Sequence, residues 1–212
     1  AQEEYTAQLK QAAARILETS RRNHRIAIVL AGRPYHTDPL VQHKISGMIA
    51  ELGADVISDD IVRGDDNTPI DESFLVRQWS YINRILKAAA WTARQGNDVH
   101  FVQITSFGCG PDAFLLDETR DILHRHGKPF TLLKVDDVNN IGSLKLRMRS
   151  LIESLRTNND TAVTAPFITT PVFKKSDKRK KILAPYFSEY TTPLLKPIFE
   201  LAGYDVEILP ID

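Results

Sequence analysis

The sequence contains one cysteine among its 212 residues, and only two tryptophans and two methionines. One cysteine excludes an internal disulfide and is typical of a reducing compartment, so we expect a cytoplasmic protein. No apolar run reaches the roughly eighteen residues of a membrane span, and no signal-peptide pattern is present. The chain starts with Ala1 instead of methionine, which indicates that it was cut from a longer protein.

A net charge of either sign is also missing, because 27 lysines and arginines balance 27 aspartates and glutamates. A neutral chain has no overall field that would attract nucleic acid or an anionic membrane, and we expect neither as a partner. The Walker P-loop, the dinucleotide-binding GxGxxG pattern and the hydrolase GxSxG pattern are absent. The familiar signatures of nucleotide binding and serine hydrolysis are therefore lacking.

What the chain does contain is an alternation of strand and helix patterns. After an amphipathic N-terminal helix within residues 1–24, short apolar runs predict strands and longer periodic runs predict helices. The strands are expected at 25–31, 54–58, 99–105 and 130–135, and the helices at 39–52, 72–94, 111–126 and 143–155. Such an alternation predicts an α/β fold with a flavodoxin-like or Rossmann-like three-layer parallel sheet, in the strand order 2-1-3-4.

Three local features belong to this prediction. Asp38 is expected to cap a helix that begins at Pro39 and carries Leu40 on its apolar stripe. Trp79 is expected on the apolar stripe of the long helix, whose polar groups at Gln78, Ser80, Tyr81 and Asn83 face either a site or, as we favour, water. The aspartate-rich stretch 59–71 lacks the spacing of a calcium loop and is expected to be solvated.

The chain changes character after residue 157. We expect an α/β domain at 25–157, a linker at 158–180 and the start of a second α/β domain at 181–212. The last stretch, KILAPYFSEYTTPLLKPIFELAGYDVEILP, echoes IAIVLAGRPYHTDPLVQHKISGMIAELGADVIS and indicates an internal repeat. A single strand-helix-strand unit cannot cover both faces of its sheet, so truncation of a larger protein is expected. The lysine run KKSDKRKK is assigned to the linker instead of a nucleic-acid surface.

The predicted strand order brings two loops together. The first and third strands are central neighbours, so GRPYHTD (32–38) and SFGCG (106–110) are expected to line the crevice at the switch point. Cys109 lies between Gly108 and Gly110, and three chemistries stay open for it: a nucleophile with His36 as its base, an inert thiol, or an iron-sulfur ligand. His36 itself is either an acid or base, or a loop histidine hydrogen-bonded to backbone.

Four segments carry a family resemblance. AGRPYHTDPLVQH, QWSYINRILKAA, SFGCGPDAF and DDVNNIGSLKLRMRSLIESL together resemble the accessory region of large CoA-substrate-specific enzyme activases, which are related to the 2-hydroxyacyl-CoA dehydratases. The resemblance implies tandem flavodoxin-like domains with a [4Fe-4S] cluster held between them by cysteines from separate segments. It makes Cys109 a metal ligand. Gly32, Arg33, Pro34, Tyr35 and His36 match the family's loop beside the cluster. We also expect Ser106, Gly108 and Gly110, which surround Cys109, to contribute to cofactor binding.

The resemblance also implies an ATPase domain of the actin and sugar-kinase class, of which no part is visible in this chain. Our first hypothesis is an iron-sulfur module for low-potential electron transfer, inactive by itself and without a complete cluster. Its expected partners are the remainder of its own chain, including the ATPase domain, and a dehydratase or a second copy. The alternative is a non-redox module that binds CoA or a nucleotide at the crevice. A scaffold that oligomerises through its N-terminal helix and second-domain strands is a third hypothesis.

Overall fold

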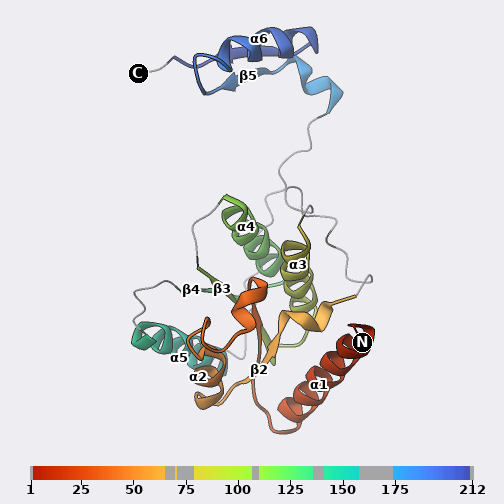
Figure 1. The fold of residues 1–212 in the computed structure, drawn as a ribbon, viewed down its shortest axis with the longest axis vertical. Coiled ribbons are helices and arrows are strands. Elements are labelled where there is room, and N and C mark those ends of the chain that lie inside the picture. The colour runs from red at the N-terminus through yellow and green to blue at the C-terminus, as the bar shows by residue number, and fades with distance from the viewer. Residues whose placement is uncertain are drawn as a thin grey trace. The chain divides into compact units, whose positions relative to one another are not determined.

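The computed structural model describes residues 2–64, 70, 79–106, 110–135, 141–157 and 174–210. The chain divides into two compact units, Ala1–Phe167 and Ile168–Asp212, and each is described by itself (Figure 1). Within the described residues, no helix is both long enough and apolar enough to cross a membrane.

The first unit has a parallel sheet whose described strands follow the order β2-β1-β3-β4. Ala27 at the start of β1 pairs with Asp55 on one side and with Val99 on the other, so β1 and β3 are central neighbours. The α/β class and the strand order predicted from the sequence are confirmed. The strands are β1 (Ala27–Ala31), β2 (Asp55–Ser58), β3 (Val99–Thr105) and β4 (Phe130–Lys134), and the helices are α1 (Gln2–Arg22), η1 (Pro34–Thr37), α2 (Ile45–Glu51), η2 (Asp59–Val62), α3 (Ser80–Ala93), α4 (Gly110–Arg125) and α5 (Ile141–Thr157).

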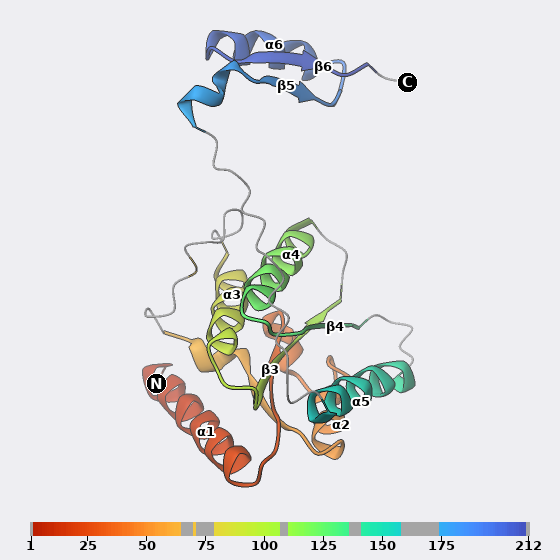
Figure 2. The same cartoon turned by 180° about the vertical axis from the view of Figure 1, so that it is seen from behind.

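Helices cover both faces of this sheet and produce two separate cores. On one face, α1, α3 and α4 pack against Val29 and Phe101. On the other face, α2 and α5 pack against Ile28 and Val102. Figures 1 and 2 show α3 beside α4, and α2 beside α5, from opposite sides. Successive strand residues thus point into different cores, and both are apolar because a doubly covered parallel sheet is buried on both faces.

The two edge strands of the sheet are bordered in different ways. At β2, the helix α1 contributes Ser20, whose Oγ donates to Asp55 Oδ2 at 2.7 Å. At β4, the helix α5 contributes Arg147, whose Nη1 donates to the backbone carbonyl of Leu132 at 2.9 Å. The first contact joins residues 35 apart in the chain, and the second joins β4 to the helix that follows it.

The helix predicted from Pro39 starts later than expected. Asp38 does act as a cap, because its Oδ1 accepts from the backbone N–H groups of Leu40 and Val41. That turn does not continue, since His43 and Lys44 adopt the left-handed conformation, with φ of 52° and 57°, and α2 begins only at Ile45. Leu40 is 77% exposed, so its predicted place on the apolar stripe is wrong.

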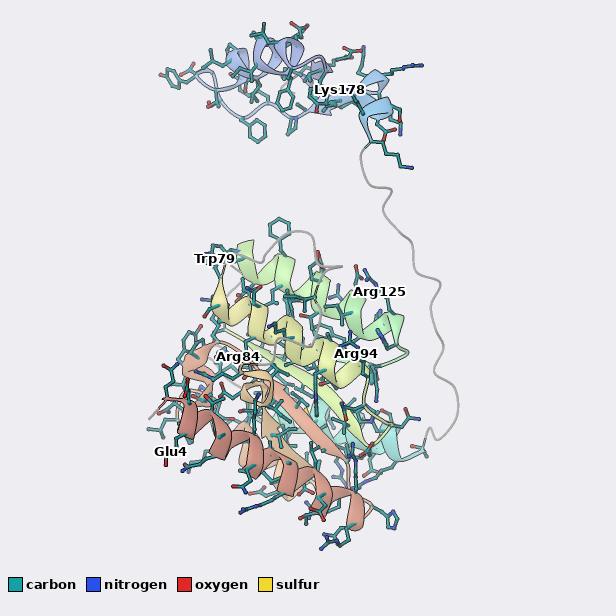
Figure 3. All side chains as sticks on the ribbon, turned by 90° about the vertical axis from the view of Figure 1, so that its right-hand side faces the viewer. Glu4, Trp79, Arg84, Arg94, Arg125 and Lys178 are labelled. Carbon is teal, nitrogen blue, oxygen red and sulfur yellow. The ribbon has the colours of Figure 1, made fainter. Side chains whose placement is uncertain are left out.

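The start of the long third helix also differs from the prediction. Trp79 has extended backbone angles and a 43% exposed side chain at the N-cap of α3, so it does not belong to the helical stripe (Figure 3). The predicted turns before it, including Gln78, lie outside the described residues. Ser80 is exposed as expected, whereas Tyr81 and Asn83 are partly buried. Tyr81 faces the loop 32–38, because the Arg33 guanidinium of that loop lies over its ring.

The second unit repeats the first strand-helix-strand motif. It contains η3 (Lys175–Arg179), β5 (Lys181–Ala184), α6 (Thr192–Leu201) and β6 (Asp205–Ile208). The strands β5 and β6 are parallel, with Lys181 opposite Asp205. In the first unit, Ala27 lies opposite Asp55 in the same way. The predicted start of a second parallel sheet is therefore confirmed.

Candidate binding site

The two predicted crevice loops meet through His36. Its Nε2 lies 2.7 Å from Ser106 Oγ, and its Nδ1 accepts the backbone N–H of Arg33 at 3.1 Å. Because Nδ1 is an acceptor, the ring proton is on Nε2 and is donated to Ser106. A Cβ added to Gly32 would lie 2.6 Å from His36 Nδ1, so the close approach of the ring requires glycine there. The predicted meeting of the two loops is confirmed at Ser106, the described residue of the second loop that contacts His36.

This geometry decides between the two interpretations of His36. The ring is buried, with an exposed fraction of 5%, and both nitrogens have partners within the loops. Burial, assisted by the neighbouring Arg33 charge, lowers the pKa of His36 to about 4. A neutral ring with both nitrogens engaged is a positioning group, so the structure supports the loop histidine and offers little to a base role toward Cys109.

An ion pair joins the same loops a second time. Arg33 donates through Nη2 to Asp112 Oδ1 at 2.8 Å and through Nε to Asp112 Oδ2 at 3.2 Å. Thr105 Oγ1 also donates to Asp112 Oδ2, at 3.2 Å. The hydrogen bonds that Arg33 donates to Asp112 raise the pKa of Arg33 above its ordinary value despite the opposing effect of burial. The guanidinium carbon lies 5.4 Å from the centre of the Tyr81 ring, a cation-π distance.

A second charged cluster follows β2. Arg84 lies on α3 (Figure 3). It donates through Nε to Asp59 Oδ2 at 3.1 Å, and Asp60 Oδ1 accepts from Arg63 Nη2 at 2.7 Å. Asp59 and Asp60 are 2% and 8% exposed, so the prediction of a solvated loop is wrong for these two residues. Their carboxylates are buried because arginines compensate them. Burial outweighs the attraction of Arg84 and raises the pKa of Asp59 to about 6.

A cavity of about 420 Å³ opens at the carboxyl ends of β1 and β2. Its volume lies within the usual range for small-molecule sites. The predicted residues that line it are Gly32, Arg33, Pro34 and His36, and the second charged cluster and Tyr5 and Leu9 of α1 complete much of the wall. This is the edge of the sheet at which ligands bind in open α/β folds.

Of the remaining predicted site residues, Tyr35, Ser106 and Gly110 are described but do not line this cavity. Tyr35 is 39% exposed and packs edge-on against His36, with ring centres 4.5 Å apart. Ser106 contacts His36 through its hydroxyl, and Gly110 is the first residue of α4. Gly108 and Cys109 lie outside the described residues.

The loop after β1 is poorly suited to hold a phosphate by its backbone. The N–H of Arg33 is given to His36, and those of Leu40 and Val41 are given to Asp38. Pro34 and Pro39 have no N–H to donate. The donors that a phosphate-binding loop needs are therefore largely committed within the loop, and charged side chains are the remaining source of attraction for an anion.

No metal-binding group appears in the part of the chain that the structure describes, since no three His, Cys, Asp or Glu side chains gather there. The whole sequence contains one thiol. A [4Fe-4S] cluster takes several thiolates, so the residues present do not form a complete ligand set for it.

The functional residues missed by sequence reasoning are charged groups that pair over long sequence distances. Asp59, Asp60 and Arg63 were assigned to a solvated stretch, and Arg84 was not singled out. One signal was available, because two aspartates directly after a buried strand must lie at the carboxyl edge of the sheet. Their arginine partners have no comparable local signature.

Together the fold and the cavity define the class of this protein as a doubly wound α/β domain with a small-molecule-sized site at the carboxyl edge of its sheet, beside β1 and β2. Residues 1–62 match a family model described as the CoA enzyme activase uncharacterised domain. The matched segment contains β1, β2 and η2, and it confirms the predicted resemblance for that part of the chain. Comparison with curated proteins and with solved structures found no match.

Proposed function

We propose that this chain is the accessory α/β part of a protein of the CoA enzyme activase type, in which Cys109 supplies one ligand to a [4Fe-4S] cluster. The cluster would provide one-electron chemistry at low potential when bound. The observation that carries the proposal is a double clamp on the residues that flank 107–109. Ser106, three residues before Cys109, is bound to His36, and Asp112, three residues after it, is bound to Arg33.

The clamp gives the residues of this chain a defined role. His36 and Arg33 belong to the loop after β1, so they hold Ser106 and Asp112, on either side of residues 107–109, against that loop. Both contacts are largely shielded from water, which keeps the clamp strong. Since the chain has one thiol, the other ligands must come from other segments or from a partner, as the resemblance implies.

The test is anaerobic purification of the tagged protein from its source cell, as wild type and as Cys109→Ala. Iron and acid-labile sulfide are counted per chain in each preparation. We expect the variant to lose most of its iron, and equal iron content in both would overturn the ligand role. Phe114→Ala serves as the matched control, because Phe114 is 52% exposed on α4 and its truncation leaves the turn intact.

A second candidate function is a non-redox module that binds CoA or a nucleotide. The observation that favours it is the cavity of about 420 Å³, which has arginine side chains in its wall and includes four of the predicted site residues. Nucleotide binding that is unchanged in Cys109→Ser would support this function, and the absence of any binding to CoA or adenine nucleotides would exclude it.

A further inference from the structure

Asp60 is placed as an acceptor at the edge of the cavity. In dinucleotide-binding sheets, an acidic residue after the second strand binds the ribose hydroxyls. Asp60 has the same position, directly after β2, and lines the cavity with Ser58. Its Oδ1 accepts two N–H groups of Arg63, and its Oδ2 accepts the hydroxyl of Ser58 at 3.3 Å. A carboxylate has about four acceptor sites, so these three bonds leave capacity for a hydroxyl.

Arg63 borders two cavities at once. It lines the cavity at the strand ends and a second one of about 540 Å³, which is also lined by Lys10 and Glu3 of α1. Two of its five N–H groups are donated to Asp60, and its side chain is 38% exposed. Asp60 thus orients a guanidinium that still has donors for an anion, and Lys10 adds a second cation beside it.

The α1 side of the first cavity is less polar. Tyr5 and Leu9 line it, and Tyr5 is 57% exposed, so its ring is available to a flat ligand. Aromatic faces stack on nucleobases at sites of this kind. An apolar wall, a ribose-type acceptor and a pair of cations therefore follow one another along the same surface of α1, β2 and η2.

We infer that this surface is a subsite for an adenosine whose ribose carries a phosphate, with Tyr5 against the base, Asp60 on a ribose hydroxyl, and Arg63 and Lys10 on the phosphate. The inference rests on the second candidate function and specifies its ligand class. Such a group occurs as the 3′-phosphate of CoA and as the 2′-phosphate of some dinucleotides. It requires neither Cys109 nor the clamp around it.

The test measures binding of three fragments by calorimetry at one fixed ionic strength: adenosine 3′,5′-bisphosphate, adenosine 2′,5′-bisphosphate and ADP. We expect one of the two bisphosphates to bind at least about tenfold more tightly than ADP, because the charge-assisted bonds to Arg63 and Lys10 are added. The preferred isomer identifies a CoA-like or a dinucleotide-like source.

Substitutions assign the effect to residues. Arg63→Gln and, independently, Lys10→Gln should reduce the bisphosphate preference and leave ADP affinity nearly unchanged. Glu3→Gln should strengthen bisphosphate binding, because Glu3 is an anion on the same cavity. Arg120→Gln is the matched control, since Arg120 forms an i,i+3 pair with Asp117 at 2.8 Å, similar to the 2.7 Å pair of Arg63 with Asp60, on another part of the domain.

The outcomes distinguish failure of the ribose-phosphate subsite from failure of nucleotide binding as a whole. If ADP binds but neither bisphosphate is preferred, or if both Arg63→Gln and Lys10→Gln leave the preference intact, the ribose-phosphate subsite is wrong while nucleotide binding stands. If none of the fragments binds, the second candidate function fails together with the subsite.

Discussion

The two strand-helix-strand units of this chain, β1-α2-β2 and β5-α6-β6, share local geometry and differ in burial. Each helix ends before a glycine with positive φ, Gly53 at 85° and Gly203 at 82°, and in each unit the two strands pair in parallel. The strand β1 is almost wholly buried, whereas β5 alternates between exposed and partly buried residues. Local sequence is therefore enough to form the motif, and its burial comes from the neighbouring strands and helices.

Large apolar side chains in the second unit show the same difference. Phe187, Tyr190, Leu194 and Leu201 are 66%, 80%, 60% and 90% exposed, and among the described strands β5 pairs with β6 alone. In the first unit β1 has strands on both sides and helices over both faces. The stability of the two units should therefore depend on different interactions, and three experiments sharpen this contrast.

The largest effect is expected from truncation of a central strand residue. Ile28→Ala in β1 should lower the free energy of unfolding of the first unit by about 3 to 4 kcal/mol, because Ile28 is fully buried and its removal leaves a cavity. Both tryptophans belong to the first unit, so tryptophan fluorescence in a urea titration measures it selectively. The matched change Ile182→Ala in β5 should leave that transition in place, and a large shift would show that the two units unfold together.

A smaller effect is expected from the ion pairs. Arg33→Ala leaves the buried Asp112 carboxylate without its partner, and we expect a loss of about 3 kcal/mol in the same titration. Lys181 and Glu207 of the second unit also form a pair, at 3.0 Å, but their side chains are 53% and 56% exposed. Solvent screens such a pair, so Lys181→Ala should destabilise the second unit far less than Arg33→Ala destabilises the first. Hydrogen exchange of the β5 and β6 amides measures this change, because tryptophan fluorescence reports on the first unit. Similar costs for both changes would contradict this comparison.

The smallest effect is expected from pH, and it should appear in the first unit. Burial is the main cause that lowers the pKa of His36 and of His100 to about 4, from 6.5. The unfolded chain therefore takes up these protons first, and stability present above pH 6.5 is lost as the pH falls toward 4. The raised pKa of Asp59, about 6, acts in the opposite direction over part of this range. With two histidines against one aspartate, we expect a net loss of stability as the pH falls over this range.

His100→Gln tests the pH effect directly. Its Nε2 donates to the carbonyl of Asn97 at 2.7 Å, and a glutamine amide can replace that donor without a titrating group. The variant should show a flatter dependence of urea unfolding on pH between about 6.5 and 4. An unchanged slope would exclude His100 as a source. In the second unit the shifted groups are Asp177, with its pKa lowered, and Lys181, with its pKa raised, so both titrate outside this window.

The sheet was predictable because its strands have strong local signals. Each is a short apolar run bounded by turn residues, and the alternation with helices leaves few ways to connect a parallel sheet. The meeting of the loops 32–38 and 106–110 followed from the strand order alone. By contrast, the delayed start of α2 depends on the left-handed conformation of His43 and Lys44. Histidine and lysine do not predict a positive φ, whereas glycine would.

The site was only partly predictable for a related reason. Gly32, Arg33 and His36 were located by their place after β1, since any residue there reaches the carboxyl edge of the sheet. The partners of the charged residues could not be located from the sequence, because Arg33 pairs with Asp112 across 79 residues and Arg84 pairs with Asp59 across 25. Such pairs depend on how α3 and α4 pack, which hydrophobic periodicity does not specify.

The contact of Arg147 with the Leu132 carbonyl has a consequence for how molecules of this protein meet one another. An uncovered strand at the border of a sheet is a template on which a strand of another molecule can grow. The Arg147 guanidinium occupies one backbone carbonyl of β4 by a hydrogen bond, so that carbonyl cannot accept from an added strand. The guanidinium also places a positive charge where the added strand would have to lie. Arg147 thereby acts against polymerisation of the first unit along this border.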